Sequence, residues 1–207
     1  MASLIKVDKL DPQSGTALEI GTSGDTINVP SGVTLDINSG ATLDATGATV
    51  TGAIGITASS FWRLTTTFAG DASPIASNLE VADDASYGSL GSAMTQSSGI
   101  FTFPLTGYWL VGFGVQFNAN SADGRCAPSI QATINDSAYD TVCEFSVAAN
   151  TTGAYNNGYG QALIDVTDVA NVKVRFSQNQ VTSDSNSTYG STDANVTFMS
   201  FTRLGDT

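Results

Sequence analysis

Aromatic residues are confined to one part of this chain, and that distribution limits what the chain can fold into. All sixteen Phe and Tyr residues and both Trp residues lie within residues 61–207. Residues 21–56 contain no aromatic side chain and almost no bulky one. Because large apolar side chains supply most of the area that a core buries, we expect one packed domain over residues 61–207, preceded by an appendage.

Short apolar runs alternate with turn-forming residues throughout the second part. Alternation is clearest where Val172, Val174 and Phe176 lie opposite Lys173 and Arg175, which is the period of a strand with one buried face. Eight such segments predict an all-β, two-sheet jelly roll. They are residues 61–68, 100–104, 108–117, 128–134, 139–147, 160–166, 171–178 and 195–204.

Large aromatic side chains are expected to form the core of this head domain. The predicted packing residues are Trp109, Phe113, Phe117, Phe198 and Phe201. Gly112 and Gly114 lie between members of the longest apolar row. Glycine inside a strand is typical of places where another backbone comes close, so we expect another backbone or subunit to approach the second face of this strand.

A repeat occupies the aromatic-free part, which we assign as a stalk over residues 21–60. SGVTLDIN at 31–38 is followed by SGATLDAT at 39–46 and by the shorter GATVTG at 47–52. The apolar positions alternate as in a strand. They are Val33, Leu35, Ile37, Leu43 and Val50.

Such short strands bury too little surface alone. We therefore expect three chains to wrap about one axis there and form a β-rich trimeric stalk. A flexible Gly/Ser/Thr linker is the alternative, although a solvated linker has no use for an apolar face.

Residues 1–20 combine an apolar start with Pro12 and Gly15. We interpret them as an arm that attaches the chain to another protein, with simple terminal disorder as the alternative. The residues expected to make that attachment are Leu4, Ile5, Val7 and Leu10.

The segment GIFTFPLTGYWLVGFGVQF (99–117) resembles the signature of complement globular-head and tumour necrosis factor-like jelly rolls. Three further segments follow in the order of that family: SIQATINDSAYDTVCEF (129–145), GQALIDVTDVANVKVRFSQ (160–178) and TFMSFTRL (197–204). This resemblance covers roughly residues 61–204. It implies a homotrimer packed through aromatic faces, as the predicted stalk also does.

LEIGTSGDTINVPSGVTLD (18–36) is similar in composition to stalk segments of bacteriophage fibre and head-fibre proteins. The start MASLIKVDKLD lacks the pattern of a secretory signal, and no stretch is apolar enough to insert into a membrane. We therefore expect synthesis in the host cytoplasm and a final location on the virion surface.

Charge and residue types exclude several classes of function. The net charge of −12 disfavours nucleic acid as a partner. Without any His, the chain lacks Ser-His-Asp and Cys-His catalysis, and no phosphate loop or nucleophile elbow occurs. We expect no enzymatic activity and no cofactor.

Two further possibilities, a calcium site and a disulfide bond, each involve two or three residues. Asp83, Asp84 and Asp123 are weak candidates for binding calcium, a cation that prefers six to eight oxygens, although no EF-hand spacing supports them. Cys126 and Cys143 would lie within about two residues of register if Asn135-Asp136 forms a hairpin turn. A disulfide between them and two reduced, buried thiols are both open.

These features predict a non-enzymatic, homotrimeric phage protein, either a capsid decoration protein, a head fibre or a short fibre that displays the jelly roll. The alternative is a receptor-binding tail-fibre tip that recognises a host glycan or protein through loops 69–79, 118–125 and 180–193. A depolymerase would need catalytic residues and length that the chain lacks.

Overall fold

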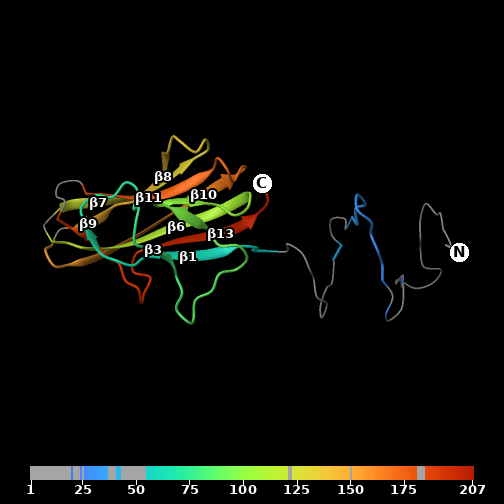
Figure 1. Ribbon diagram of the computed structural model, residues 1–207, viewed down its shortest axis with the longest axis horizontal. Coiled ribbons are helices and arrows are strands. Elements are labelled where there is room, and N and C mark those ends of the chain that lie inside the picture. Colours follow the sequence, from blue (N-terminus) through green and yellow to red (C-terminus); the bar gives the residue numbers. More distant parts are fainter. Residues whose placement is uncertain are drawn as a thin grey trace. The chain divides into compact units, whose positions relative to one another are not determined.

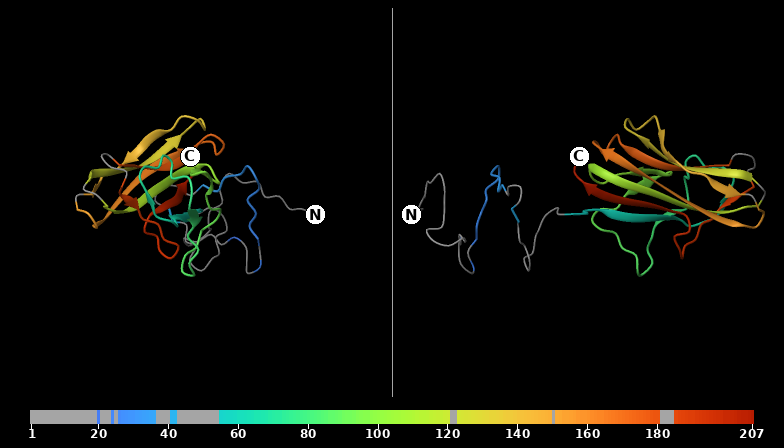
Figure 2. Two further views of the ribbon diagram at one scale, coloured as in Figure 1. Left: turned by 60° about the vertical axis from the view of Figure 1, so that its left-hand side comes forward. Right: turned by 180° about the vertical axis from the view of Figure 1, so that it is seen from behind.

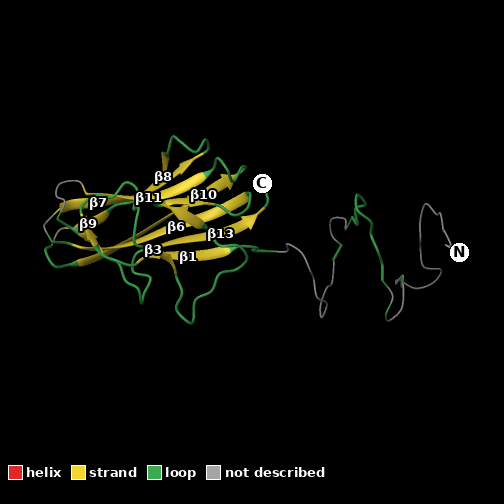
Figure 3. Ribbon diagram, in the orientation of Figure 1, coloured by secondary structure: helices red, strands yellow, loops and turns green. Residues whose placement is uncertain are grey.

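The computed structural model describes residues 20, 24, 26–36, 41–42, 55–120, 123–149, 151–180 and 185–207, without the side chains of residues 123, 124, 149 and 180. Contacts divide the chain into two units, Met1–Val50 and Thr51–Thr207. Figure 3 shows strands and loops but no helix in the described part.

The second unit is a sandwich of two antiparallel sheets, which confirms the predicted all-β jelly roll (Figure 1). Sheet A has the order β2-β12-β6-β13-β1-β3. Strands β12 and β13 follow one another along one edge of β6, and β10 pairs along the opposite edge. Its strands are β1 (Ser59–Leu64), β2 (Phe68–Ala69), β3 (Leu79–Val81), β6 (Gly107–Asn118), β10 (Tyr155–Val166), β12 (Ser187–Thr188) and β13 (Phe198–Gly205).

Sheet B has the order β4-β5-β11-β7-β8, with β9 also paired to β7. Its strands are β4 (Thr95–Ser97), β5 (Ile100–Thr102), β7 (Asp123–Thr133), β8 (Asp140–Glu144), β9 (Val147–Ala149) and β11 (Lys173–Gln180). Sequential strands β5, β6 and β7 belong to sheets B, A and B in turn. This exchange between sheets is typical of a jelly roll.

Aromatic rings from both sheets fill the space between them. The Phe176 ring of β11 lies 5.0 Å from that of Phe113 on β6 and 5.4 Å from that of Phe101 on β5. Trp109, Phe113, Phe117 and Phe201 are buried, as expected of packing residues. Phe198 is not in the core, because its position on β13 alternates with the buried Met199 and Phe201 and faces outward.

The chain enters and leaves the sandwich at one end, seen from behind in Figure 2. Ser59 of β1 pairs with Thr202, and Gly205 of β13 pairs with Tyr108. We call this the near end. The opposite, far end of sheet A is where Asn118 of β6 pairs with Tyr155.

Of the predicted repeat at residues 31–52, the structure describes residues 31–36 and 41–42. Residues 26–36 form no strand, and a turn at Ser31–Gly32 is closed by the Val33 amide donating to the Pro30 carbonyl over 3.1 Å. Val33 and Leu35 are exposed. A strand needs a partner for its backbone groups, and the described single chain offers none here. Ile37, Leu43 and Val50 lie outside the described residues.

Candidate self-association surface

The outer face of sheet A carries large apolar side chains that alternate with the core residues of the same strands. One register row joins Phe198 of β13 to Gly114 of β6 and to Tyr159 of β10. We call the apolar members of this surface the aromatic face. They are Phe61, Tyr108, Leu110, Tyr159, Leu163, Phe198 and Leu204.

Two glycines make the centre of the aromatic face shallow. A Cβ atom on Gly114 would overlap the Phe198 ring, and one on Gly112 would overlap the Tyr159 hydroxyl. The rings therefore lie across the glycine backbone. Side chains of the same chain, and not another of its backbone segments, occupy the space next to these glycines, and the expected approach of another subunit stays a prediction.

The rings form a continuous strip across three strands. The Phe198 centroid lies 5.9 Å from that of Phe61 on β1 and 6.3 Å from that of Tyr159, the latter in a stacked arrangement. Even so, Tyr159 remains 53% exposed and Leu163 60% exposed. Exposed apolar surface of this extent marks an interaction site in soluble proteins.

The aromatic face is also nearly free of charge. Across the outward positions of β6, β10 and β13, Asp165 is the charged residue, at the near end. The whole chain carries a net charge of −12. Charge depletion in the centre of a patch is typical of a protein interface.

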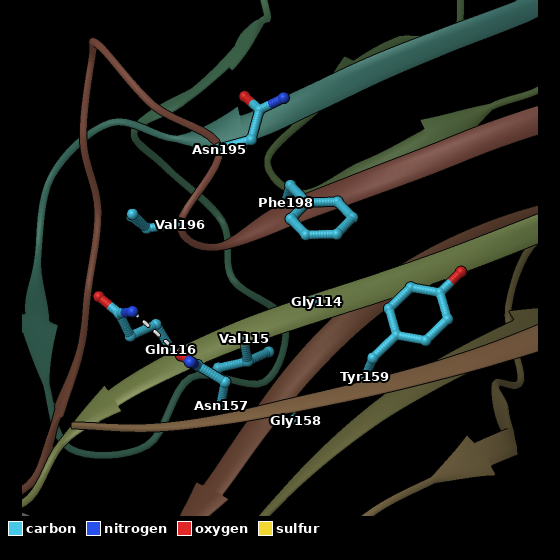
Figure 4. A pocket seen from close by; sticks show the side chains of 9 residues that line it. All are labelled: Gly114, Val115, Gln116, Asn157, Gly158, Tyr159, Asn195, Val196 and Phe198. Atoms are coloured by element: carbon cyan, nitrogen blue, oxygen red, sulfur yellow. Dashed lines mark hydrogen bonds between the residues drawn. The ribbon is translucent and has the colours of Figure 1, made fainter.

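An open hollow of about 480 Å³ lies at the far end of this face (Figure 4). The Phe198 and Tyr159 rings line one side, and Gln116 and Asn157 line the other. The Gln116 Nε2 atom donates to Asn157 Oδ1 over 3.0 Å. Asn195 adds a third amide, whose Oδ1 atom is buried without a hydrogen-bond partner.

Arg63 borders the aromatic face and is almost fully buried at 1% side-chain exposure. Its guanidinium binds Glu80 over 2.7 Å, Asp83 over 2.6 Å and also Asp84. The Glu80 hydrogen bond raises the pKa of Arg63, burial opposes that change, and Asp84 adds to it. The cluster ties the segment after β3 to β1.

This cluster corrects the calcium interpretation of Asp83 and Asp84. Their carboxylates neutralise Arg63 and do not gather around an open cation position. Among the described side chains, no group of three or more His, Cys, Asp or Glu residues could hold a metal. The side chain of Asp123 lies outside the described residues.

The cysteines are farther apart in register than the sequence suggested. Cys126 lies opposite Val147, and Cys143 lies opposite Ile130, so four residues separate them along the ladder. That offset corresponds to about 13 Å, beyond the reach of a disulfide, and the two thiols are not joined. The reason is a longer loop between β7 and β8 than a two-residue turn, with a bulge between Ile130 and Gln131.

Several further expectations concern residues that are not described. Leu4, Ile5, Val7 and Leu10 of the attachment arm are among them, so that arm stays a prediction. In the part of the chain that is described, no helix is long and apolar enough to cross a membrane.

Sequence reasoning missed most of the outer face. The sequence placed Phe61 in a strand but did not indicate which face of the sheet its side chain lies on. Tyr159 precedes residue 160, the predicted start of its strand. The spacing of Tyr155, Tyr159 and Leu163 was a usable signal, since residues four apart on a strand share one face.

Comparison with solved structures supports the topology. The tumour necrosis factor Eiger from S. frugiperda matches with a TM-score of 0.55 at 11% identity, over 74% of this chain and 96% of that one. Murine APRIL at pH 8.5 matches with a TM-score of 0.51 at 11% identity, over 71% and 98%. The head shares the jelly-roll fold of these two structures.

At this level of identity, the likeness of the jelly roll to these structures concerns the fold alone. No protein-family model matches the chain. No curated protein shows significant similarity to it either.

Proposed function

We propose that the chain is a non-enzymatic structural protein that forms a homotrimer through the aromatic face. The observation that carries this proposal is a wide, uncharged apolar surface on a chain of net charge −12. Burying Tyr159, Leu163 and Leu204 against a second copy removes their apolar area from water and brings few like charges together. A subunit count of three rests on the octads, which are too small to bury a core singly.

We further propose that the trimer is displayed on the surface of a phage particle as a capsid decoration protein, head fibre or short fibre. The repeat at residues 31–52 and its likeness in composition to phage fibre stalks support this location. The absence of His and of phosphate-loop motifs supports a structural role. Residues 1–20 would attach the chain to a capsid or tail protein.

Sedimentation of the full chain tests the homotrimer. At micromolar concentration, the main species should have three times the 21.3 kDa mass of one chain. Leu163→Asp places a charge on the aromatic face and should raise the dissociation constant at least about a hundredfold, since an unpaired buried charge costs several kcal/mol.

Ile134→Asp is the matched control. Ile134 is 81% exposed in the loop after β7 on the other sheet, so this variant should sediment like the original protein. A stable monomer of the unmodified chain, or equal effects of both substitutions, would contradict the assignment of the face.

Particle incorporation tests the proposed location separately. Deleting residues 1–20 should abolish incorporation into virions while the soluble trimer remains. Copy number then distinguishes the two placements: hundreds of copies per particle indicate capsid decoration, and a dozen or two indicate a tail appendage. If the truncated protein still decorates particles, the attachment arm is wrongly assigned.

A further inference from the structure

The outer face of sheet B carries a polar hollow of about 330 Å³, on the side of the sandwich opposite the aromatic face. We call it the sheet B hollow. Strands β7, β8 and β11 line it together with Asp71 and Ser73 of loop 69–79, one of the loops predicted to contact a receptor. Because the aromatic face belongs to sheet A, self-association through that face does not use the residues of this hollow.

One register row forms the floor of the sheet B hollow. Glu144 of β8 lies opposite Ser129 of β7, and Ser129 lies opposite Ser177 of β11. The row continues to Ser73, whose hydroxyl lies 3.3 Å from that of Ser177. Directly opposite residues share one face of a sheet, and Ser129 alternates with Ile130 of the core. Small serine side chains between longer neighbours therefore produce the hollow.

The Ser129 hydroxyl lies in this floor without a protein partner. The residue is 6% exposed, yet its hydroxyl makes no hydrogen bond with the described groups and remains open to the hollow. At the margin, Thr141 and Asn179 also line the hollow without side-chain hydrogen bonds to described groups. Buried polar groups normally have partners, so the floor suits a ligand that brings polar groups of its own.

The charged residues that line the sheet B hollow are Asp71 and Glu144, both acidic. Arg125 Nη1 lies 3.5 Å from Glu144 Oε1, with both side chains about half exposed. Arg175 is held over the Tyr139 ring, 4.1 Å from its centroid, and does not line the hollow. Exposed ion pairs are weak, so the Glu144 carboxylate can exchange Arg125 for a cation that a ligand supplies.

We propose that the sheet B hollow binds a hydroxylated organic cation of the amino-sugar class. Its ammonium group would donate to Glu144 and to the Ser129 hydroxyl, which are neighbours in the floor row. Its hydroxyl groups would bond Thr141, Asn179 and Asp71 around the margin. This inference goes beyond the proposed homotrimer and does not depend on it.

Binding of the full-length protein to matched probes tests the ligand class. The probes are the disaccharide of glucosamine, its neutral N-acetylated counterpart, and cadaverine, a diamine without hydroxyl groups. Calorimetry at about pH 6, where amino groups and carboxylates are charged, should show the glucosamine disaccharide binding at least about tenfold more tightly than either. No binding of this disaccharide, or equal affinity for either comparison probe, overturns the proposal.

Two substitutions test the contacts in the floor. Glu144→Gln should weaken binding of the glucosamine disaccharide about tenfold or more, and Ser129→Ala about three- to tenfold. Asp193→Asn and Ser86→Ala are the matched controls, because both residues are exposed and do not line the hollow. The site is refuted if the floor variants bind as tightly as the controls.

Arg125→Met tests the same ion pair with the opposite sign. It frees the Glu144 carboxylate and should tighten binding of the disaccharide about two- to fivefold. Unfolding cannot produce a gain in affinity, so this variant stays informative if a floor variant fails to fold. Unchanged or weaker binding would contradict the proposed contact with Glu144.

Sedimentation separates this inference from the proposed homotrimer. A monomeric protein that still binds the disaccharide would refute the homotrimer alone, and a trimer that does not bind it would refute the site alone. Dissociation of the trimer by Glu144→Gln would place the sheet B hollow inside the subunit interface and overturn the ligand assignment.

Discussion

Two glycines determine the form of the aromatic face. Gly112 and Gly114 leave no side chain on β6, and the rings of Tyr159 and Phe198 use the space. On the resulting surface Tyr159 remains 53% exposed. A larger residue at either position would lift the rings from the sheet.

Gly114→Ala should therefore destabilise the fold and weaken self-association. The added methyl overlaps the Phe198 ring, and overpacking of this kind costs roughly 1–3 kcal/mol. Gly88→Ala is a matched control, since its new methyl meets open space, and its effect should stay within about 0.5 kcal/mol. Urea denaturation measures both values, and equal losses would contradict the packing described.

Single residues show what sequence could and could not predict here. Trp109, Phe113 and Phe117 were predictable as core because strict alternation on one long strand fixes a common face. Phe198 was grouped with these core residues as a large aromatic side chain. The face of the sheet on which it lies depends on how β13 pairs with β6. Asp83 and Asp84 were misread because their partner, Arg63, lies about twenty residues away in sequence.

At the scale of elements, long strands were predicted well and short ones poorly. Segments 108–117 and 171–178 correspond to β6 and β11 with shifts of two residues or fewer. β3, β4 and β12 have only two or three residues each, too few for periodicity to register. Residues 155–159 of β10 were missed because Asn and Gly are depleted in strands, whereas pairing with β6 overrides that preference.

Arg63 of β1 binds Asp83 and Asp84 after β3, next to a backbone bond that the Ala82 amide donates to the Phe61 carbonyl over 3.0 Å. Arg63→Met should lower the free energy of unfolding by about 1.5–3 kcal/mol, because it removes the charged hydrogen bonds to three carboxylates that are themselves at least 35% exposed. Arg125→Met is the control. Arg125 pairs with Glu144 at the surface, 3.5 Å apart and with both side chains about half exposed.

Exposed ion pairs contribute only about 0–1 kcal/mol to stability. Arg125→Met should therefore leave the free energy of unfolding, measured with denaturant, nearly unchanged. Limited proteolysis gives a second readout, with faster cleavage after Asp84 in the Arg63 variant alone. Comparable stability of the two variants would show that the cluster does not hold this segment.

At the scale of the whole molecule, charge opposes the proposed assembly. Three chains of net charge −12 repel one another, and salt screens that repulsion over about 10 Å at 0.1 M. Self-association should therefore strengthen as ionic strength rises from about 0.02 to 0.5 M. Sedimentation velocity across this range checks it, and trimers that weaken with salt would indicate ion pairing across the interface.

The global fold class was predictable because eight alternating segments and a jelly-roll-like order of motifs agree with one another. The aromatic face was not, since it needs the pairing of β1, β13, β6 and β10, which come from widely separated parts of the chain. The function of the first fifty residues still rests on composition and repeat.

Both chain ends of the sandwich lie side by side, and this arrangement suits peptide display. A tag fused after Thr207 would sit beside the point where residues 55–59 join β1. The turn at Thr151–Ala154 lies at the opposite end, where Gly153 has open space around it. A peptide inserted there would project from the far end and would not contact residues 55–59, which lead into β1.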